Sequence, residues 1–112
     1  MIRLAFALLV AAFATAAPAD RITELGPPDR CMYTAKLYVA GYFYYLKGTA
    51  RADVKIHWHG DETQNEIDFV NRTIDAAYQR ADALKRDGKQ PAVSEQQFGD
   101  DAYAACMTGR SL

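Results

Sequence analysis

TQNEIDFVNRTIDAAYQRADALKR, at positions 63–86, carries the clearest helix signal of the chain. It opens with a capping box, in which the hydroxyl of Thr63 and the carboxylate of Glu66 each accept a hydrogen bond from an otherwise unpaired backbone N–H group. Apolar residues then recur at steps of three and four, the spacing that places side chains on one face of a helix. These residues are Ile67, Val70, Ile74, Ala77, Ala81 and Leu84. The pattern predicts an amphipathic helix that ends near Arg86.

A second long helix is predicted before this one. Gly26-Pro27-Pro28 cannot continue a helix, so residues 20–28 are expected to form an irregular lead-in. Asp29 is a good N-cap for a helix over 30–47. Gly48 stands where a glycine is expected just past a helix end.

A last helix is predicted near the end of the chain. Asp87, Gly88 and Pro91 indicate a stop followed by a loop. Ser94-Glu-Gln-Gln97 then matches a second capping box. The residues that share a face of the helix behind it are Phe98, Ala102, Ala105 and Cys106.

Residues 50–58, between the first two long helices, allow two interpretations. Thr49 is a suitable cap for a short helix, which is the interpretation we favour. The alternation of Val54, Ile56 and Trp58 equally suits a short extended piece. The expected fold is therefore all-α, a small bundle of three main helices plus one short helix.

Residues 1–19 differ in character from the rest of the chain. Arg3 precedes an unbroken apolar run from Leu4 to Ala14, and small residues follow up to Ala19. These are the parts of a secretory signal peptide, and the apolar run is too short to span a bilayer as a helix. We therefore expect a signal peptide at 1–19 and a single periplasmic or secreted domain at 20–112, without stable membrane insertion.

The charge pattern argues against nucleic acid as a partner. The chain has 13 Lys and Arg against 14 Asp and Glu, a formal net charge of -1 at pH 7. A phosphate-binding face needs a continuous basic patch. Here the basic residues are scattered, and Lys85, Arg86 and Lys89 form the only local group.

Cys31 and Cys106 are the only cysteines, and they lie near opposite ends of the expected domain. Two distant cysteines in an oxidising compartment are expected to pair. A reactive or metal-binding thiol pair would normally show close spacing, such as C-x-x-C. We predict a structural disulfide that joins the first long helix to the last.

The first long helix carries five of the seven tyrosines. A rotation of about 100° per residue separates its apolar residues into two stripes. The stripe on the disulfide side contains Cys31, Ala35, Tyr38, Tyr42 and Tyr45, and the stripe nearly opposite contains Tyr33, Leu37 and Tyr44. The second stripe either packs against another helix or is exposed and binds a partner, since tyrosine is enriched at interface hot spots. We take Tyr33, Leu37 and Tyr44 as the candidate partner-binding residues.

His57-Trp58-His59 suggests a metal site at first sight. In a strand the two histidines would share a face and could chelate an ion, whereas in a helix they would point apart. Because a firm third ligand is missing, we expect a solvated turn with a packed Trp58, and no metal or cofactor. Neither Ser94 nor Ser111 has a histidine nearby in sequence. We therefore predict no catalytic residues and a protein that is not an enzyme.

The leader, the single small domain, the early helical Cys31 and the late helical Cys106 together resemble the layout of small two-cysteine helical periplasmic proteins. That group includes immunity proteins of type VI secretion amidase effectors, which plug the active-site groove of a cell-wall-degrading toxin. It also includes acid-stress chaperones, which bind unfolding clients at low pH.

The resemblance implies a non-enzymatic binding protein, most simply an inhibitor or immunity protein that blocks a protein partner such as a cell-wall-degrading toxin. One alternative is an acid or envelope stress chaperone. A second is a metal-binding periplasmic protein that uses His57 and His59. The sequence leaves open whether the chain forms a homodimer.

Overall fold

A computed structural model shows an all-α fold and describes residues 20–110 and 112. The expected signal peptide at 1–19 lies outside the described residues. The elements are α2 (Arg21–Glu24), α3 (Pro27–Leu46), α4 (Gln64–Arg86) and α5 (Glu95–Thr108), with short 3-10 turns η1 (Arg51–Asp53) and η2 (Gln90–Ala92). The predicted bundle of three main helices and one short helix is confirmed, but the short helix lies at 21–24.

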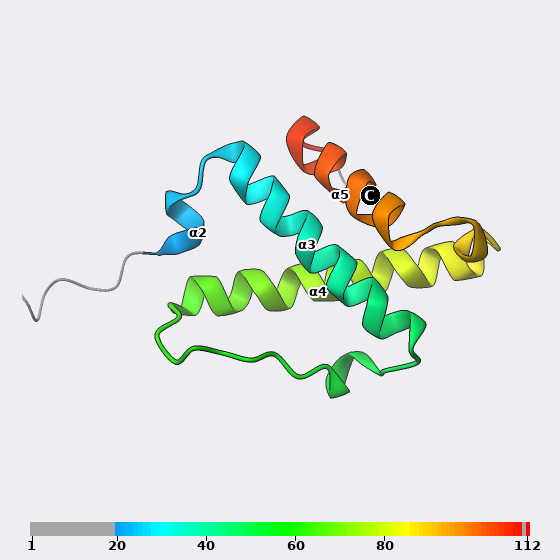
Figure 1. Cartoon of the computed structure of the whole chain (residues 1–112), viewed down its shortest axis with the longest axis horizontal. Coiled ribbons are helices and arrows are strands. Elements are labelled where there is room, and N and C mark those ends of the chain that lie inside the picture. The colour runs from blue at the N-terminus through cyan, green and yellow to red at the C-terminus, as the bar shows by residue number, and fades with distance from the viewer. Residues whose placement is uncertain (1–19, 111) are drawn as a thin grey trace, which may run out of the picture.

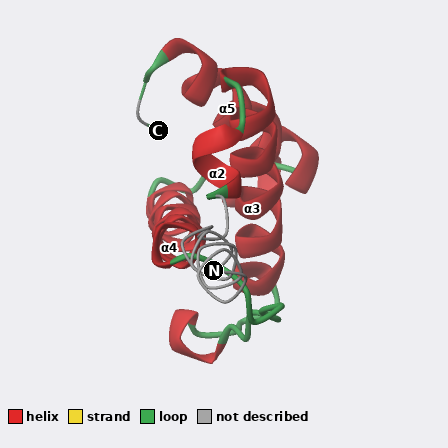
Figure 2. Cartoon of the chain, turned by 90° about the vertical axis from the view of Figure 1, so that its left-hand side faces the viewer, coloured by secondary structure: helices red, strands yellow, loops and turns green. Residues whose placement is uncertain are grey.

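The long helix α3 is the centre of the bundle. It packs on both α5 and α4. The last helix, α5, runs antiparallel beside α3, and α4 crosses α3 (Figures 1 and 2). The connection that leaves α3 returns along α4 to the start of that helix (Figure 1). Between residues 20 and 110, no helix is long and apolar enough to cross a membrane.

Helix α4 forms as the sequence predicts. Its capping box is present, because the Thr63 N–H donates to Glu66 Oε1 at 2.8 Å and the Glu66 N–H donates to Thr63 Oγ1 at 3.1 Å. Val70 and the other apolar residues of the predicted stripe are buried, except Ile67, which is half-buried. The stripe is wider than predicted, since Tyr78 is buried as well.

Helix α3 begins earlier than predicted, and the prediction that residues 20–28 are irregular was wrong. Gly26 is the N-cap, and Pro27 and Pro28 occupy the first two helical positions. Proline is tolerated there because the first-turn N–H groups of a helix have no intrahelical partner. Asp29 therefore lies in the first turn rather than at the cap. Residues 21–24 form α2, which Asp20 caps by accepting hydrogen bonds from two backbone N–H groups.

The favoured helix over 50–58 is also wrong, and the extended alternative is right for most of this segment. Only η1 is helical, and the chain from Val54 onward is extended. Val54 and Ile56 alternate inward and pack beside Val70 and Ile74 of α4. Arg51 anchors the segment, because its Nε lies 2.6 Å from Asp75 Oδ1 on α4. These tertiary contacts outweigh the weak local helix signal.

Helix α5 has only half of the capping box predicted for it. Ser94 Oγ accepts a hydrogen bond from the Gln97 N–H at 3.1 Å. The Gln97 side chain does not complete the box, because it donates instead to Asp101 at 2.7 Å, one turn further along the helix. Phe98, together with Ala102 and Ala105, is buried as the predicted face requires.

The disulfide between Cys31 and Cys106 is confirmed. The Cα atoms of the two cysteines lie 5.5 Å apart, and the bond joins the first turns of α3 to the end of α5. Between the helices, Tyr42 is fully buried and stacks on Phe98, with ring centroids 4.1 Å apart. Gly41 allows α3 and α4 to approach closely, since a Cβ at position 41 would lie 2.8 Å from the Ala77 Cβ.

Candidate functional site

An apolar groove between α3, α4 and residues 54–62 borders the predicted partner-binding residues. Its volume is about 500 Å³, within the range of roughly 300–1,000 Å³ that ligand sites occupy. Helix α3 contributes Tyr33, Leu37 and Tyr44, all three residues of the candidate stripe, and α4 contributes Val70 and Ile74. We call this hollow the α3–α4 groove.

Each residue of the candidate stripe is half-buried. All three pack against the buried cluster of Val70 and Ile74, and they also line the groove. The stripe therefore forms a wall that rests on the core and presents part of its surface to the hollow. Packing against another helix, one of the two interpretations that the sequence left open, is confirmed, and partner binding by the stripe stays a prediction.

The tyrosine rings of this wall are held in place by other aromatic residues. Tyr33 stacks on Phe69 of α4, with ring centroids 5.9 Å apart and the planes 14° from parallel. Tyr44 and Phe43 contact each other edge to face at 5.6 Å. Burial raises the pKa of Tyr33, with the charge of Glu66 acting in the same direction. The Tyr33 hydroxyl can donate a hydrogen bond.

The opposite wall of the groove is the extended segment that contains His57, Trp58 and His59. All three are exposed, and Trp58 keeps 40% of its surface accessible. They nevertheless border the groove. The expected packing of Trp58 is thus wrong, because the segment lies along the surface rather than folding into a compact turn.

Glu62 holds the end of this segment. Its carboxylate accepts hydrogen bonds from the backbone N–H groups of His59 and Gly60, the second at 2.9 Å. These bonds, the one from His59 first, lower the pKa of Glu62. Gly60 adopts a φ of 103°, which favours glycine and allows the sharp bend.

The two histidines do not form part of a larger ligand set. Among the residues that the structure describes, no group of three or more His, Cys, Asp and Glu side chains is placed to hold a metal ion. A metal at this point would have His57 and His59 as its nitrogen ligands.

A charged cluster closes one end of the groove. Arg21 Nε lies 2.7 Å from Glu66 Oε2, and Arg21 Nη2 lies 3.3 Å from Asp61 Oδ1. The hydrogen bond from Arg21 is the largest cause of the lowered pKa of Glu66, followed by the backbone N–H of Thr63. Arg21 has a raised pKa for the same reason. The rest of the groove is lined mainly by apolar and aromatic residues.

Sequence reasoning identified the α3 wall but missed the remaining parts of the groove. Arg21 falls in the stretch expected to be irregular, and its partner Glu66 was assigned a capping role alone. The two residues are 45 positions apart, and no local pattern connects them.

Comparison with models of protein families, with curated proteins and with solved structures finds no match to this chain.

Proposed function

We propose that this chain is a non-enzymatic binding protein of the cell envelope that blocks a protein partner through the α3–α4 groove, as an inhibitor or immunity protein does. The observation that carries the proposal is the convergence of Tyr33, Leu37 and Tyr44 on one apolar hollow. Tyrosine offers a large contact area with a hydrogen-bonding tip at little cost in side-chain entropy. A partner would insert an apolar side chain between these rings.

Two features support an envelope location for this activity. The sequence opens with the expected signal peptide, and the described chain carries a disulfide between cysteines 75 positions apart. Structural disulfides persist in oxidising compartments such as the periplasm and are rare in reducing ones. A partner in the same compartment, such as a cell-wall-degrading toxin, fits the layout shared with the immunity proteins of type VI secretion amidase effectors.

The groove proposal predicts a selective loss of binding. In the double variant Tyr33→Ala with Tyr44→Ala, capture of the partner from a periplasmic extract is expected to fall by about 30-fold or more, since hot-spot residues contribute about 2 kcal/mol or more. The measurement is a quantitative pull-down combined with a thermal melt of the purified variant. The expected melting temperature falls only moderately, because both side chains are half-buried.

Leu46→Ala provides the matched control. Leu46 lies near Tyr44 on α3 and is 47% exposed, yet it does not line the groove. Its replacement should leave capture unchanged. A large loss of stability with unchanged capture in the double tyrosine variant would assign these rings to the core alone and remove the proposal.

A second candidate function, an acid-stress chaperone, is favoured by the carboxylates at the rim of the groove. Glu62 and Glu66 both have lowered pKa values, because each accepts hydrogen bonds that hold the rim together. Protonation of either carboxylate removes those interactions. Acid would therefore loosen the segment at 54–62 and uncover the apolar walls.

This candidate predicts a specific pH dependence. The pKa of Glu66 in the folded chain lies below its ordinary value of 4.5, so its stabilisation is present above that value and is lost as the pH falls through the folded pKa. The variant Glu66→Gln should be less stable than the parent at pH 7 and should lose less stability between pH 7 and pH 3. Denaturant unfolding at the two pH values measures this.

Exposed Glu24 is the control, and Glu24→Gln should retain the pH dependence of the parent. An equal loss of stability on acidification in parent and Glu66→Gln would contradict the role of this carboxylate. If the chain acts as a chaperone, the parent protein should suppress aggregation of an unfolding client at pH 3 and not at pH 7.

A further inference from the structure

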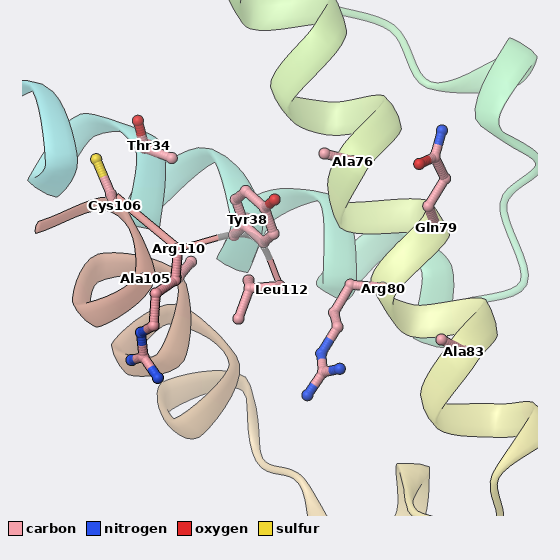
Figure 3. A pocket seen from close by; sticks show the side chains of 11 residues that line it. Thr34, Tyr38, Ala76, Gln79, Arg80, Ala83, Ala105, Cys106, Arg110 and Leu112 are labelled. Atoms are coloured by element: carbon pink, nitrogen blue, oxygen red, sulfur yellow. The ribbon is translucent and has the colours of Figure 1, made fainter. Parts of the chain in front are cut away.

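A second hollow, separate from the α3–α4 groove, lies where α3, α4 and α5 meet (Figure 3). Its volume is about 370 Å³, and it shares no lining residue with the groove. Alanines from two helices, including Ala76, Ala83 and Ala105, form much of its surface. These small side chains create the space, because longer side chains at the same positions would fill it.

Two arginines, Arg80 and Arg110, stand at the rim of this pocket. Among the described residues, neither arginine forms an ion pair with a side-chain carboxylate. The residues three and four positions away from Arg80 on α4 are Ala76, Ala77, Ala83 and Leu84. An acidic residue at one of these positions would be needed for an ion pair along the helix. The guanidinium group of Arg80 is therefore available to a ligand.

Arg110, which lies just beyond the end of α5, supplies a second guanidinium group. Its Nε donates to Thr108 Oγ1 at 2.8 Å, which orients the group and leaves the terminal nitrogens for other contacts. In Figure 3 the Arg80 and Arg110 side chains extend toward the same open side of the pocket, with Leu112 between them. None of the described residues that line the pocket has an acidic side chain.

Tyr38 lies deeper in the pocket and links the charged rim to the alanine surface. It is half-buried and packs beside Phe98, with ring centroids 5.7 Å apart. Burial raises the pKa of Tyr38, while the positive charge of Arg80 acts in the opposite direction, which reflects the closeness of the two groups. The pocket thus combines two cationic donors with an apolar, aromatic interior.

We propose that this pocket binds a carboxylate carried on a small apolar body. The guanidinium fork of arginine matches the two oxygens of a carboxylate and forms paired, charge-assisted hydrogen bonds. Arg80 and Arg110 would hold the carboxylate, while Tyr38 and the alanines would contact the apolar body. A fully hydrated inorganic anion would leave that interior uncovered. This proposal does not depend on the function assigned to the groove.

Titration of the purified, disulfide-bonded chain with N-acetyl-leucine, followed by NMR, tests the proposal. Saturable shifts are expected at Tyr38, Ala76 and the side-chain N–H groups of Arg80. N-acetyl-leucinamide, which lacks the charge, should bind at least about tenfold more weakly, because hydrogen bonds to charged groups are the stronger ones. Arg80→Gln should weaken binding of the acid by a similar factor.

Arg86→Gln is the matched control, since Arg86 belongs to the same helix but does not line the pocket. It should leave binding of N-acetyl-leucine unchanged, and thermal melts should show both variants folded. Equal binding of the acid and the amide, equal binding by the parent and Arg80→Gln, or the absence of shifts with N-acetyl-leucine would each overturn the proposal.

The carboxylate of the ligand could belong to the end of a protein chain or to a small free acid. Binding of a decapeptide that ends in a leucine carboxylate distinguishes these two sources. Tighter binding of the peptide than of N-acetyl-leucine would support the pocket and assign it to protein chain ends. Weaker binding of the peptide would support the pocket and assign it to small free acids.

Discussion

Removal of the disulfide by the double variant Cys31→Ser with Cys106→Ser is expected to lower the free energy of unfolding by about 4 kcal/mol. The bond closes a loop between residues 75 positions apart, so its main effect is to restrict the unfolded chain. A domain of this size buries a modest core, and a cross-link therefore supplies a large share of its stability. Urea denaturation of the variant and the parent measures the difference.

Reduction of the disulfide in the parent protein should lower the free energy of unfolding by the same amount. The variant and the dithiothreitol-treated parent should unfold at the same urea concentration, because both lack only the cross-link. A reduced parent that unfolds at the same urea concentration as the oxidised parent would show that the bond contributes nothing, and would contradict its structural role.

Truncation of Tyr42 should produce a second large loss of stability. The side chain is fully buried, stacks on Phe98, and donates its hydroxyl to Val93 O at 2.9 Å. It thereby ties α3 to α5 and to the connection that precedes α5. Tyr42→Ala removes the ring from the centre of the bundle and is expected to cost about 3–5 kcal/mol, the range for large buried aromatic residues.

Tyr42→Phe separates packing from hydrogen bonding at the same position. It keeps the stack on Phe98 and removes only the hydroxyl, so the expected cost is about 1 kcal/mol. Urea denaturation of both variants gives the comparison. Equal losses in Tyr42→Phe and Tyr42→Ala would contradict the importance of the stack, and a loss below about 1 kcal/mol in Tyr42→Ala would contradict the central position of the ring.

Local sequence patterns predict correctly those helices whose signals all lie within the helix itself. The capping box of Thr63 and Glu66 and the apolar stripe behind it specify α4 without help from the rest of the chain. The start of α3 was missed because Pro27 and Pro28 were treated as helix breakers, although the first helical positions accept proline.

Segments that depend on distant contacts were beyond local prediction. Residues 50–58 carry signals for both helix and extended chain, and the packing of Val54 and Ile56 against the buried α4 cluster favours the extended arrangement. The predicted second capping box formed only in half for a local reason, since the Gln97 side chain donates to Asp101, four residues further along α5.

In the candidate site, too, only the part that lies within one helix was predicted from the sequence. The helical periodicity of α3 grouped Tyr33, Leu37 and Tyr44 correctly on one stripe. The other wall of the groove comes from an extended segment, and the charged end joins Arg21 to Glu66 across 45 positions. The pocket at Arg80 and Arg110 likewise requires three helices to meet, which no motif in the sequence indicates.

Binding of a protein partner in the α3–α4 groove is tested most directly by photocrosslinking in the cells that produce the chain. A photoreactive phenylalanine analogue replaces Tyr44 in the groove or, in a separate variant, the adjacent exposed Phe43. The predicted result is one discrete protein adduct from position 44 that is absent from position 43. Equal labelling from the two positions, or no adduct from position 44, would contradict the groove as the binding surface.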